Sequence, residues 1–298
     1  MPYFDSSWQS WLAENVKRRC SPESMIKAMT DAGFDVATAT MKVVESLNPE
    51  AVQQHNVLAP FKSPAAPIVP AQQGRTANHF QYDPAPVAAG HAIDVGDRIV
   101  TVALRLEKPQ IIVFNNVLSH EECDELIERS RSKLKRSTTV NPITGEHDVI
   151  ERRTSEGTFF ELCENEFITR IDERVARLMN WPIRNGEGLQ ILHYGVGGEY
   201  RPHFDFFPPE DKGSLTHLAM GGQRVSTMVM YLNDVEAGGE TIFPELGLAV
   251  SPQKGSAVYF RYTNAQGQVD PLTLHGGAPV VAGEKWIMTK WMRQSSYG

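Results

Sequence analysis

The segment YGVGGEYRPHFD at 194–205 ends with a histidine and an aspartate two residues apart, His203 and Asp205. In an extended strand, residues i and i+2 face the same side, so we expect the imidazole and the carboxylate to project into one space. A third candidate ligand, His275, lies in the run TLHGG, between segments with a strand-like pattern. Two histidines and one carboxylate on one face suit a non-haem Fe(II) ion, and they leave positions open for a co-substrate and dioxygen.

A purely structural role is the competing interpretation, because a histidine in an apolar strand is more often a hydrogen-bonded core residue than a ligand. Lys285, ten residues after His275, favours the metal site. The run EKWIMTKWMRQ alternates as a strand, and one of its predicted faces carries Lys285, Ile287, Thr289 and Trp291. A lysine on that face is buried at a cost unless an anion meets it, and a carboxylate of a dicarboxylic co-substrate would meet it.

A wider set of residues has the order and spacing of a known family. The set comprises Tyr194, His203, Asp205, Thr241, His275, Lys285 and Trp291, together with RTSEGTFF at 153–160 and RVSTMVMYLND at 224–234. Over roughly the last 200 residues, the chain resembles the catalytic domain of the prolyl 4-hydroxylase family of Fe(II)- and 2-oxoglutarate-dependent dioxygenases. The joint spacing is far more specific than any single motif.

This resemblance implies an α+β fold whose catalytic domain, at 93–298, is a double-stranded β-helix (jelly roll) with supporting helices. It also implies a role for each matched residue. Fe(II) would be bound by His203, Asp205 and His275, while Lys285 would bind the far carboxylate of 2-oxoglutarate with help from Tyr194 and Thr241. The peptide channel would be lined by Tyr200, Arg224 and Trp291.

The implied reaction is that of a procollagen-proline 4-dioxygenase-like enzyme. Such an enzyme uses dioxygen and 2-oxoglutarate to hydroxylate a prolyl residue in a peptide or protein, and it releases succinate and CO2. The resemblance further implies that L-ascorbate restores iron that has become oxidised.

Two other functions stay open at this stage. The same chemistry could act on a free amino acid, another side chain or alkylated nucleic acid, although nucleic-acid demethylases of this superfamily typically hold the far carboxylate with arginine rather than lysine. Alternatively, the jelly roll could be the scaffold of a non-catalytic binding protein. A complete ligand set together with Lys285 argues against a scaffold.

Composition narrows the partners and the compartment. A hydrophobic share of 41% supports a buried core, and a formal net charge of -7 argues against a sequence-independent grip on nucleic acid. The three cysteines, Cys20, Cys123 and Cys163, lack CxxC spacing, so we expect neither a disulfide framework nor a zinc site. We therefore expect the protein in the reducing cytoplasm. We find no signal peptide and no apolar run approaching the length of a membrane span.

Before the catalytic domain, the pattern changes twice. Residues 1–49 read as a small all-α module with apolar residues at helical spacing, a helix start at Ser21-Pro22, and a third helix carrying Met41, Val44 and Leu47. Such a module is a candidate for binding a protein partner. Residues 50–92 are rich in proline and alanine and predict a semi-extended linker.

Within the catalytic region, Ser119 and Glu122 form a capping box for a helix to about Leu134. A basic run follows, comprising Arg129, Arg131, Lys133, Lys135 and Arg136. It indicates either a solvated helix end or a docking patch for an acidic partner. The segment NPITGEHD after it corresponds in the family to a mobile lid, and a second helix should end at Trp181-Pro182.

Overall fold

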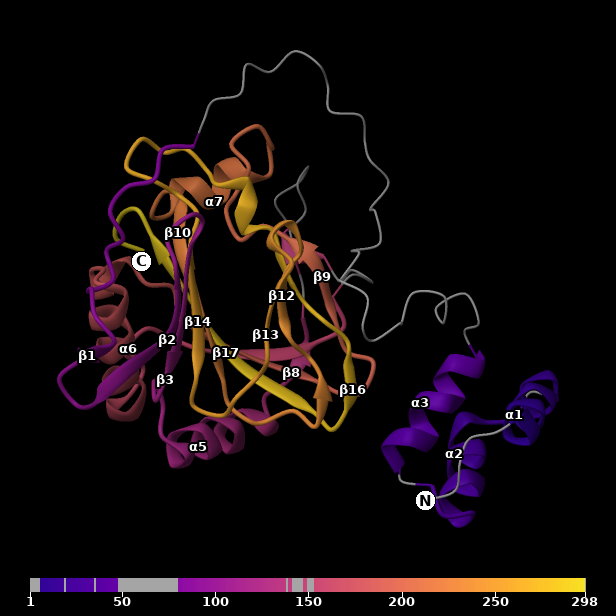
Figure 1. Ribbon diagram of the computed structural model, residues 1–298. Coiled ribbons are helices and arrows are strands. Elements are labelled where there is room, and N and C mark those ends of the chain that lie inside the picture. Colours follow the sequence, from indigo (N-terminus) through magenta and orange to yellow (C-terminus); the bar gives the residue numbers. More distant parts are fainter. Residues whose placement is uncertain are drawn as a thin grey trace. The chain divides into compact units, whose positions relative to one another are not determined.

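The computed structural model describes residues 6–18, 20–34, 36–47, 80–137, 139–140, 147–148 and 153–297. The chain forms two compact units, Met1–Pro67 and Ile68–Gly298, which are drawn together in Figure 1 and described here separately.

The first unit contains the three predicted helices, α1 (Ser6–Lys17), α2 (Pro22–Asp31) and α3 (Val36–Leu47). The hydroxyl oxygen of Ser21 accepts a hydrogen bond from the backbone N–H of Ser24, so α2 begins as expected, with proline in its first turn. The helices enclose a small core that includes Leu12, Met25 and Met29. Leu47, which we expected on the third helix, lies in the last turn of α3 and is 42% exposed.

The second unit is the predicted jelly roll, built from antiparallel sheets. The larger sheet has nine strands in the order β1-β2-β3-β14-β10-β17-β8-β7-β4. Their bounds are Ala92–Asp94 (β1), Ile99–Leu106 (β2), Gln110–Asn115 (β3), Lys135–Arg136 (β4), Glu156–Phe160 (β7), Leu189–Tyr194 (β8), Arg224–Tyr231 (β10), Ala257–Arg261 (β14) and Lys285–Arg293 (β17).

The smaller sheet has four strands in the order β13-β12-β15-β9, and Figure 1 shows it facing the larger one. Its strands are Tyr200–His203 (β9), Thr241–Phe243 (β12), Leu248–Val250 (β13) and His275–Gly277 (β15). Two short pairs complete the strands, namely Ala237–Gly238 (β11) with Val280–Ala282 (β16), and Thr139–Val140 (β5) with His147–Asp148 (β6).

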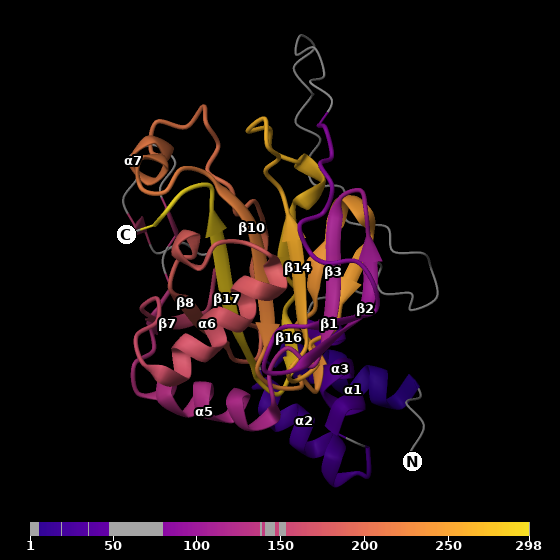
Figure 2. The same ribbon diagram turned by 90° about the vertical axis from the view of Figure 1, so that its left-hand side faces the viewer.

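Alternation along β17 assigns its two faces to different cores. Trp286, Met288 and Met292 pack with residues of α5 (His120–Arg131) and α6 (Glu166–Met179), which cover the outer face of the larger sheet (Figure 2). Ile287, on the opposite face, belongs to the core between the two sheets. The alternation predicted for this strand is therefore confirmed, and it directs Lys285 and Trp291 into the space between the sheets.

The helices begin and end at sequence signals. The capping box of α5 is formed by Ser119 and Glu122 as predicted, although the helix ends at Arg131 rather than near residue 134. Asn165 caps α6, and Asn180 ends it in the left-handed conformation, at φ 48°, directly before Trp181. One further α-helix, α7 (Ser214–Ala219), and three 3-10 helices, η1 (Ile183–Asn185), η2 (Pro244–Leu246) and η3 (Pro271–Thr273), complete the described elements.

The last part of the predicted linker belongs to the catalytic unit. The carboxylate of Asp83 pairs with Arg261 at 2.8 Å, the backbone oxygen of Pro86 accepts from Asn180, and Val87 is buried in the main core. The boundary predicted at residue 93 therefore lies inside this unit. Residues 50–79 of the predicted linker lie outside the described residues, whereas side-chain partners fix the described end of that segment in place.

Three further expectations concern the rest of the chain. Cys20, Cys123 and Cys163 are all free thiols. In the described ranges, no helix combines the length and the apolar character needed to cross a membrane. The lid predicted around NPITGEHD lies largely outside the described residues, since only the paired strands β5 and β6 are described there.

Candidate active site

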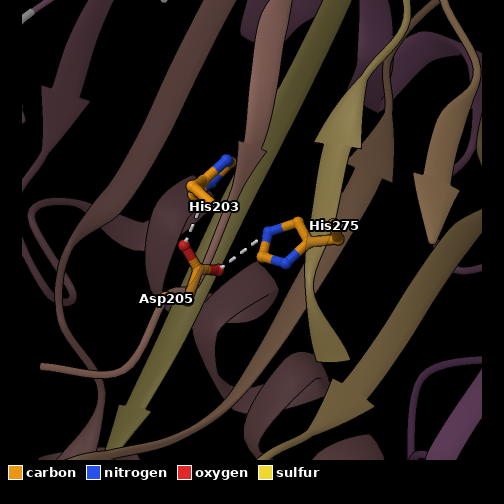
Figure 3. A group of neighbouring side chains, drawn as sticks. All are labelled: His203, Asp205 and His275. Atoms are coloured by element: carbon orange, nitrogen blue, oxygen red, sulfur yellow. Dashed lines mark ion pairs between the residues drawn. The ribbon is translucent and has the colours of Figure 1, made fainter. Parts of the chain in front are cut away.

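His203, Asp205 and His275 converge on one point between the two sheets (Figure 3). His203 ends β9, His275 begins β15, and the two histidines are register partners in the smaller sheet. Each Nε2 atom lies 3.5 Å from one oxygen of the Asp205 carboxylate. One candidate ligand atom from each residue lies within 4.8 Å of the others, so a single metal ion can be reached by all three.

The route to this convergence differs from the expected one. His203 and Asp205 were predicted to share an extended strand, but β9 ends at His203 and Asp205 lies in the bend that follows. Chain reversal and pairing with β15, rather than strand alternation alone, bring the carboxylate between the two imidazoles.

Backbone carbonyls fix the protonation of both imidazoles. The Nδ1 atom of His203 lies 2.9 Å from the oxygen of Arg201, and that of His275 lies 3.0 Å from the oxygen of Thr273. A carbonyl oxygen can only accept, so each Nδ1 carries the proton and each Nε2 presents a lone pair. Burial lowers the pKa of His275 to about 4, which keeps this imidazole in the neutral form that binds metals.

The Asp205 carboxylate is held by two donors from the larger sheet. Thr227 Oγ1 donates to its Oδ2 over 2.7 Å, and the indole N–H of Trp291 donates to the same oxygen over 3.0 Å. Burial alone raises the pKa of this carboxyl, but neighbouring positive charge, including the Arg224 guanidinium, and these hydrogen bonds outweigh it and hold the pKa well below its usual range. The site therefore combines an ionised carboxylate with two imidazole nitrogens.

Lys285 is a buried cation without a counter-charge. Its side chain is 3% exposed, and across the described part of the chain its Nζ forms no ion pair or hydrogen bond. Burial lowers the pKa of Lys285 to about 8, opposed only by the more distant charge of Glu240. Because an isolated buried ammonium is costly, this geometry points to an anion that occupies the space in front of it.

The neighbours of Lys285 suit a carboxylate. Tyr194 is its register partner on β8, and the Nζ lies 5.6 Å from the centre of the Tyr194 ring. Thr241, on β12, places a hydroxyl in the same cavity, where it accepts a hydrogen bond from Tyr231 over 2.7 Å. Gly277, on β15, lies close to the ammonium, where an added Cβ would lie 3.5 Å from the Nζ, an ordinary contact distance.

One cavity of about 1050 Å³ contains every site residue predicted from the sequence. Its lining includes the three candidate ligands, the group around Lys285, and the three residues predicted to contact a peptide, Tyr200, Arg224 and Trp291. A metal, a co-substrate and a substrate can therefore share one space.

The three predicted peptide-channel residues differ in the contacts that their side chains already make within the chain. The ring of Tyr200 stacks on His203, with centroids 3.6 Å apart. Arg224 makes two hydrogen bonds to the Glu187 carboxylate, at 2.7 and 2.8 Å, and its guanidinium lies 4.0 Å from the Trp291 ring. Arg224 begins β10, the next strand along the chain after β9, and β10 lies in the larger sheet.

Two residues of the site were not assigned a role from the sequence. Arg153 is buried, donates to Gln190 over 3.1 Å and places its guanidinium 4.9 Å from the Tyr200 ring. Glu187 is the shared partner of Arg224 and Arg293. Arg153 lies in the RTSEGTFF run and could have been suspected there, whereas nothing in the local sequence marks Glu187.

Comparisons with known proteins identify relatives of this chain. The model of the 2OG-Fe(II) oxygenase superfamily matches residues 189–293. Probable prolyl 4-hydroxylase 3 of Arabidopsis thaliana is 39% identical over 209 residues, covering 64% of this chain and 71% of that protein. Prolyl 4-hydroxylase 5 of the same plant is 40% identical over 203 residues, covering 62% and 68%. A solved viral collagen prolyl hydroxylase from Paramecium Bursaria Chlorella virus-1, in complex with 2OG, shares 30% identity and a TM-score of 0.49, covering 61% of this chain and 95% of its own.

Proposed function

Because the chain belongs to the prolyl 4-hydroxylase family of 2OG-Fe(II) oxygenases, we propose that it uses Fe(II) and 2-oxoglutarate to hydroxylate a prolyl residue in a peptide or protein. The observation that carries this proposal is the position of an unpaired buried lysine in the same cavity as a His-Asp-His cluster. The first group suits an anionic co-substrate and the second suits its metal.

The donor set fits Fe(II). His203 and His275 each present an Nε2 lone pair, and Asp205 presents an ionised carboxylate, which is the ligand combination of non-haem iron sites that keep positions open. Fe(II) bound there with 2-oxoglutarate would supply the oxidative decarboxylation that yields succinate and CO2 and hydroxylates an unactivated C–H bond.

The chain's own residues supply binding and orientation. We assign Lys285 to the far carboxylate of 2-oxoglutarate, as a charge-assisted pair in a site that water reaches poorly, with Tyr194 and Thr241 beside it. Thr227 and Trp291 keep the Asp205 carboxylate in place between the two imidazoles. Phe243 and Phe260 pack around His275 and form an apolar wall.

A proline-containing chain suits the remaining space. Tyr200 offers a flat ring beside the metal position, and Arg224 with Trp291 forms a second, stacked wall. Aromatic faces pack well against a pyrrolidine ring, and a polyproline II segment is already extended and loses little entropy on docking.

Three finer points belong to the same proposal. L-ascorbate would serve as the reductant that restores Fe(II) after uncoupled turnover. A reducing compartment such as the cytoplasm suits both Fe(II) and three free cysteines. The N-terminal helical module, Ser6 to Leu47, would bind a protein partner.

Succinate release tests the function directly. The iron-loaded protein is incubated with 2-oxoglutarate and either a peptide containing proline flanked on both sides or free L-proline. We expect the peptide to stimulate succinate formation far more than the free amino acid. His275→Ala should abolish the stimulation, while His193→Ala, which removes a histidine paired with Glu284 outside the cavity, should retain it. Preference for free proline would replace this proposal with an amino-acid hydroxylase.

A further inference from the structure

The cavity is basic although the chain is acidic. Eight lysines and arginines line it against three aspartates and glutamates, in a chain of formal net charge -7. Most of these cations have a defined partner. Arg224 and Arg293 pair with Glu187, and Arg201 pairs with Glu199. The buried Arg153 donates to Gln190, and Lys285 faces the position proposed for the co-substrate.

Three exposed cations at the rim remain, Lys133, Lys135 and Arg136. They form the second half of the basic run whose role the sequence left open. Arg129 and Arg131, in the first half, have acidic partners on α5, Glu125 and Glu128. In the residues that the structure describes, neither Lys135 nor Arg136 has an acidic partner within ion-pair distance. The same run therefore contains a neutralised half on the helix and an unneutralised half at the cavity.

Strand pairing directs one of these cations toward the reaction site. Lys135, Gly157, Leu192 and Ile287 form one row of register partners across β4, β7, β8 and β17. Side chains in register share a face, and this row is the inner one, since Leu192 and Ile287 line the cavity. Gly157 contributes no side chain, so nothing in the row separates Lys135 from the cavity interior. Arg136 belongs to the neighbouring row, as the register partner of Glu156, and it lines the cavity only at its rim.

We propose that the substrate is an acidic peptide, in which a carboxylate side chain close to the target proline binds Lys135, with Arg136 adding positive charge beside it at the rim. The inference rests on the proposed prolyl hydroxylation and adds its sequence preference. A charge at the rim contributes mainly to the choice of substrate and to its rate of association, because exposed ion pairs add little affinity. A nucleic acid fits less well. Its negatively charged phosphates are spread over the whole ligand, and this chain has a formal net charge of -7.

The test uses two peptides that differ only in charge, with glutamate or glutamine on both sides of a proline-containing segment. Succinate release gives KM and kcat for each peptide, and fluorescence anisotropy of the labelled peptides gives binding. The variant is Lys135→Gln with Arg136→Gln. The matched control is Arg129→Gln with Arg131→Gln, which removes the same charge from the same run but outside the cavity lining.

We expect the glutamate peptide to have a KM about three- to tenfold below that of the glutamine peptide, with similar kcat, as two exposed ion pairs allow. The Lys135 and Arg136 variant should remove this difference without changing the KM for 2-oxoglutarate, and added salt should reduce it. The control variant should keep it.

Equal KM values for the two peptides in the unmodified protein would overturn the inference while leaving prolyl hydroxylation intact. So would a variant whose KM rises for 2-oxoglutarate instead, because the cations would then belong to the co-substrate. Tight binding of a single-stranded oligonucleotide that depends on Lys135 and Arg136, without a preference for the glutamate peptide, would also overturn it. If neither peptide is hydroxylated, the proposed function fails, and this inference fails with it.

Discussion

Replacing Lys285 with methionine should weaken co-substrate binding and stabilise the empty protein at the same time. The change keeps most of the side-chain volume and removes the charge. Lys285 is 3% exposed, and its ammonium has no ion-pair partner in the described structure. Burying this charge therefore destabilises the folded protein until a carboxylate binds beside it. The two effects have opposite signs, which separates them from general damage to the fold.

The size of each effect follows from burial. Losing one partner of a buried charge pair costs roughly 2–5 kcal/mol, which corresponds to an affinity for 2-oxoglutarate about 30-fold to several thousand-fold lower. The pKa of Lys285 falls from 10.5 to about 8, so the charged lysine destabilises the folded state by up to about 3 kcal/mol at pH 7.

The sign of the pH dependence can also be checked. Below pH 8 the lysine is protonated in both the folded and the unfolded protein, so the full cost applies. Between about pH 8 and 10.5 the unfolded chain binds more protons, and the cost declines as the pH rises. The advantage of Lys285→Met in stability should therefore be largest at neutral pH.

Isothermal titration with 2-oxoglutarate and denaturant unfolding of the metal-free protein measure the two quantities. An unchanged 2-oxoglutarate affinity together with unchanged or reduced stability would refute the reasoning, because Lys285 would then be neither the anion site nor an unpaired buried charge.

Three more predictions concern the same cavity. Asp205→Ala should abolish iron binding, measured as metal stoichiometry, while circular dichroism stays unchanged; retention of one iron per chain would exclude Asp205 as a ligand. Trp291→Phe keeps the ring on Arg224 but loses the N–H bond to Asp205, so iron affinity or kcat should fall by about 10- to 100-fold, whereas Trp286→Phe, whose indole nitrogen has no hydrogen-bond partner in the described residues, should have little effect. The Kd for 2-oxoglutarate should rise by up to about tenfold per pH unit above pH 8, as Lys285 loses its proton, and this rise should be absent in Lys285→Arg; a flat profile in the unmodified protein would contradict the assignment.

Patterns that depend on a short stretch of chain were predicted correctly. Alternation along β17 identified which residues face the cavity, and the Ser119 and Glu122 capping box located the start of α5. Both signals arise from residues that are close together in the sequence, so a short segment is enough to recognise them. The metal cluster was predicted from the combined spacing of several motifs that the family shares, because the periodicity of a single segment does not show which distant residues meet.

Contacts between distant segments were the part that could not be predicted. The pairing of Arg224 with Glu187 joins residues 37 apart, and no local pattern in the sequence marks it. Asp205 lies in a bend whose direction depends on pairing between β9 and β15. The segment from residue 80 to 92 has the composition of a linker, yet Asp83 and Val87 attach it to the catalytic unit through partners far along the chain.

The most direct test of the central claim is mass spectrometry of a proline-containing peptide after incubation with the iron-loaded protein, 2-oxoglutarate and isotopically labelled dioxygen. We predict that the peptide gains one labelled oxygen atom on the proline ring, in amounts that match the succinate released, and that His203→Ala abolishes both. Succinate formation without any oxygen on proline, or an oxygen atom on a different residue, would contradict it.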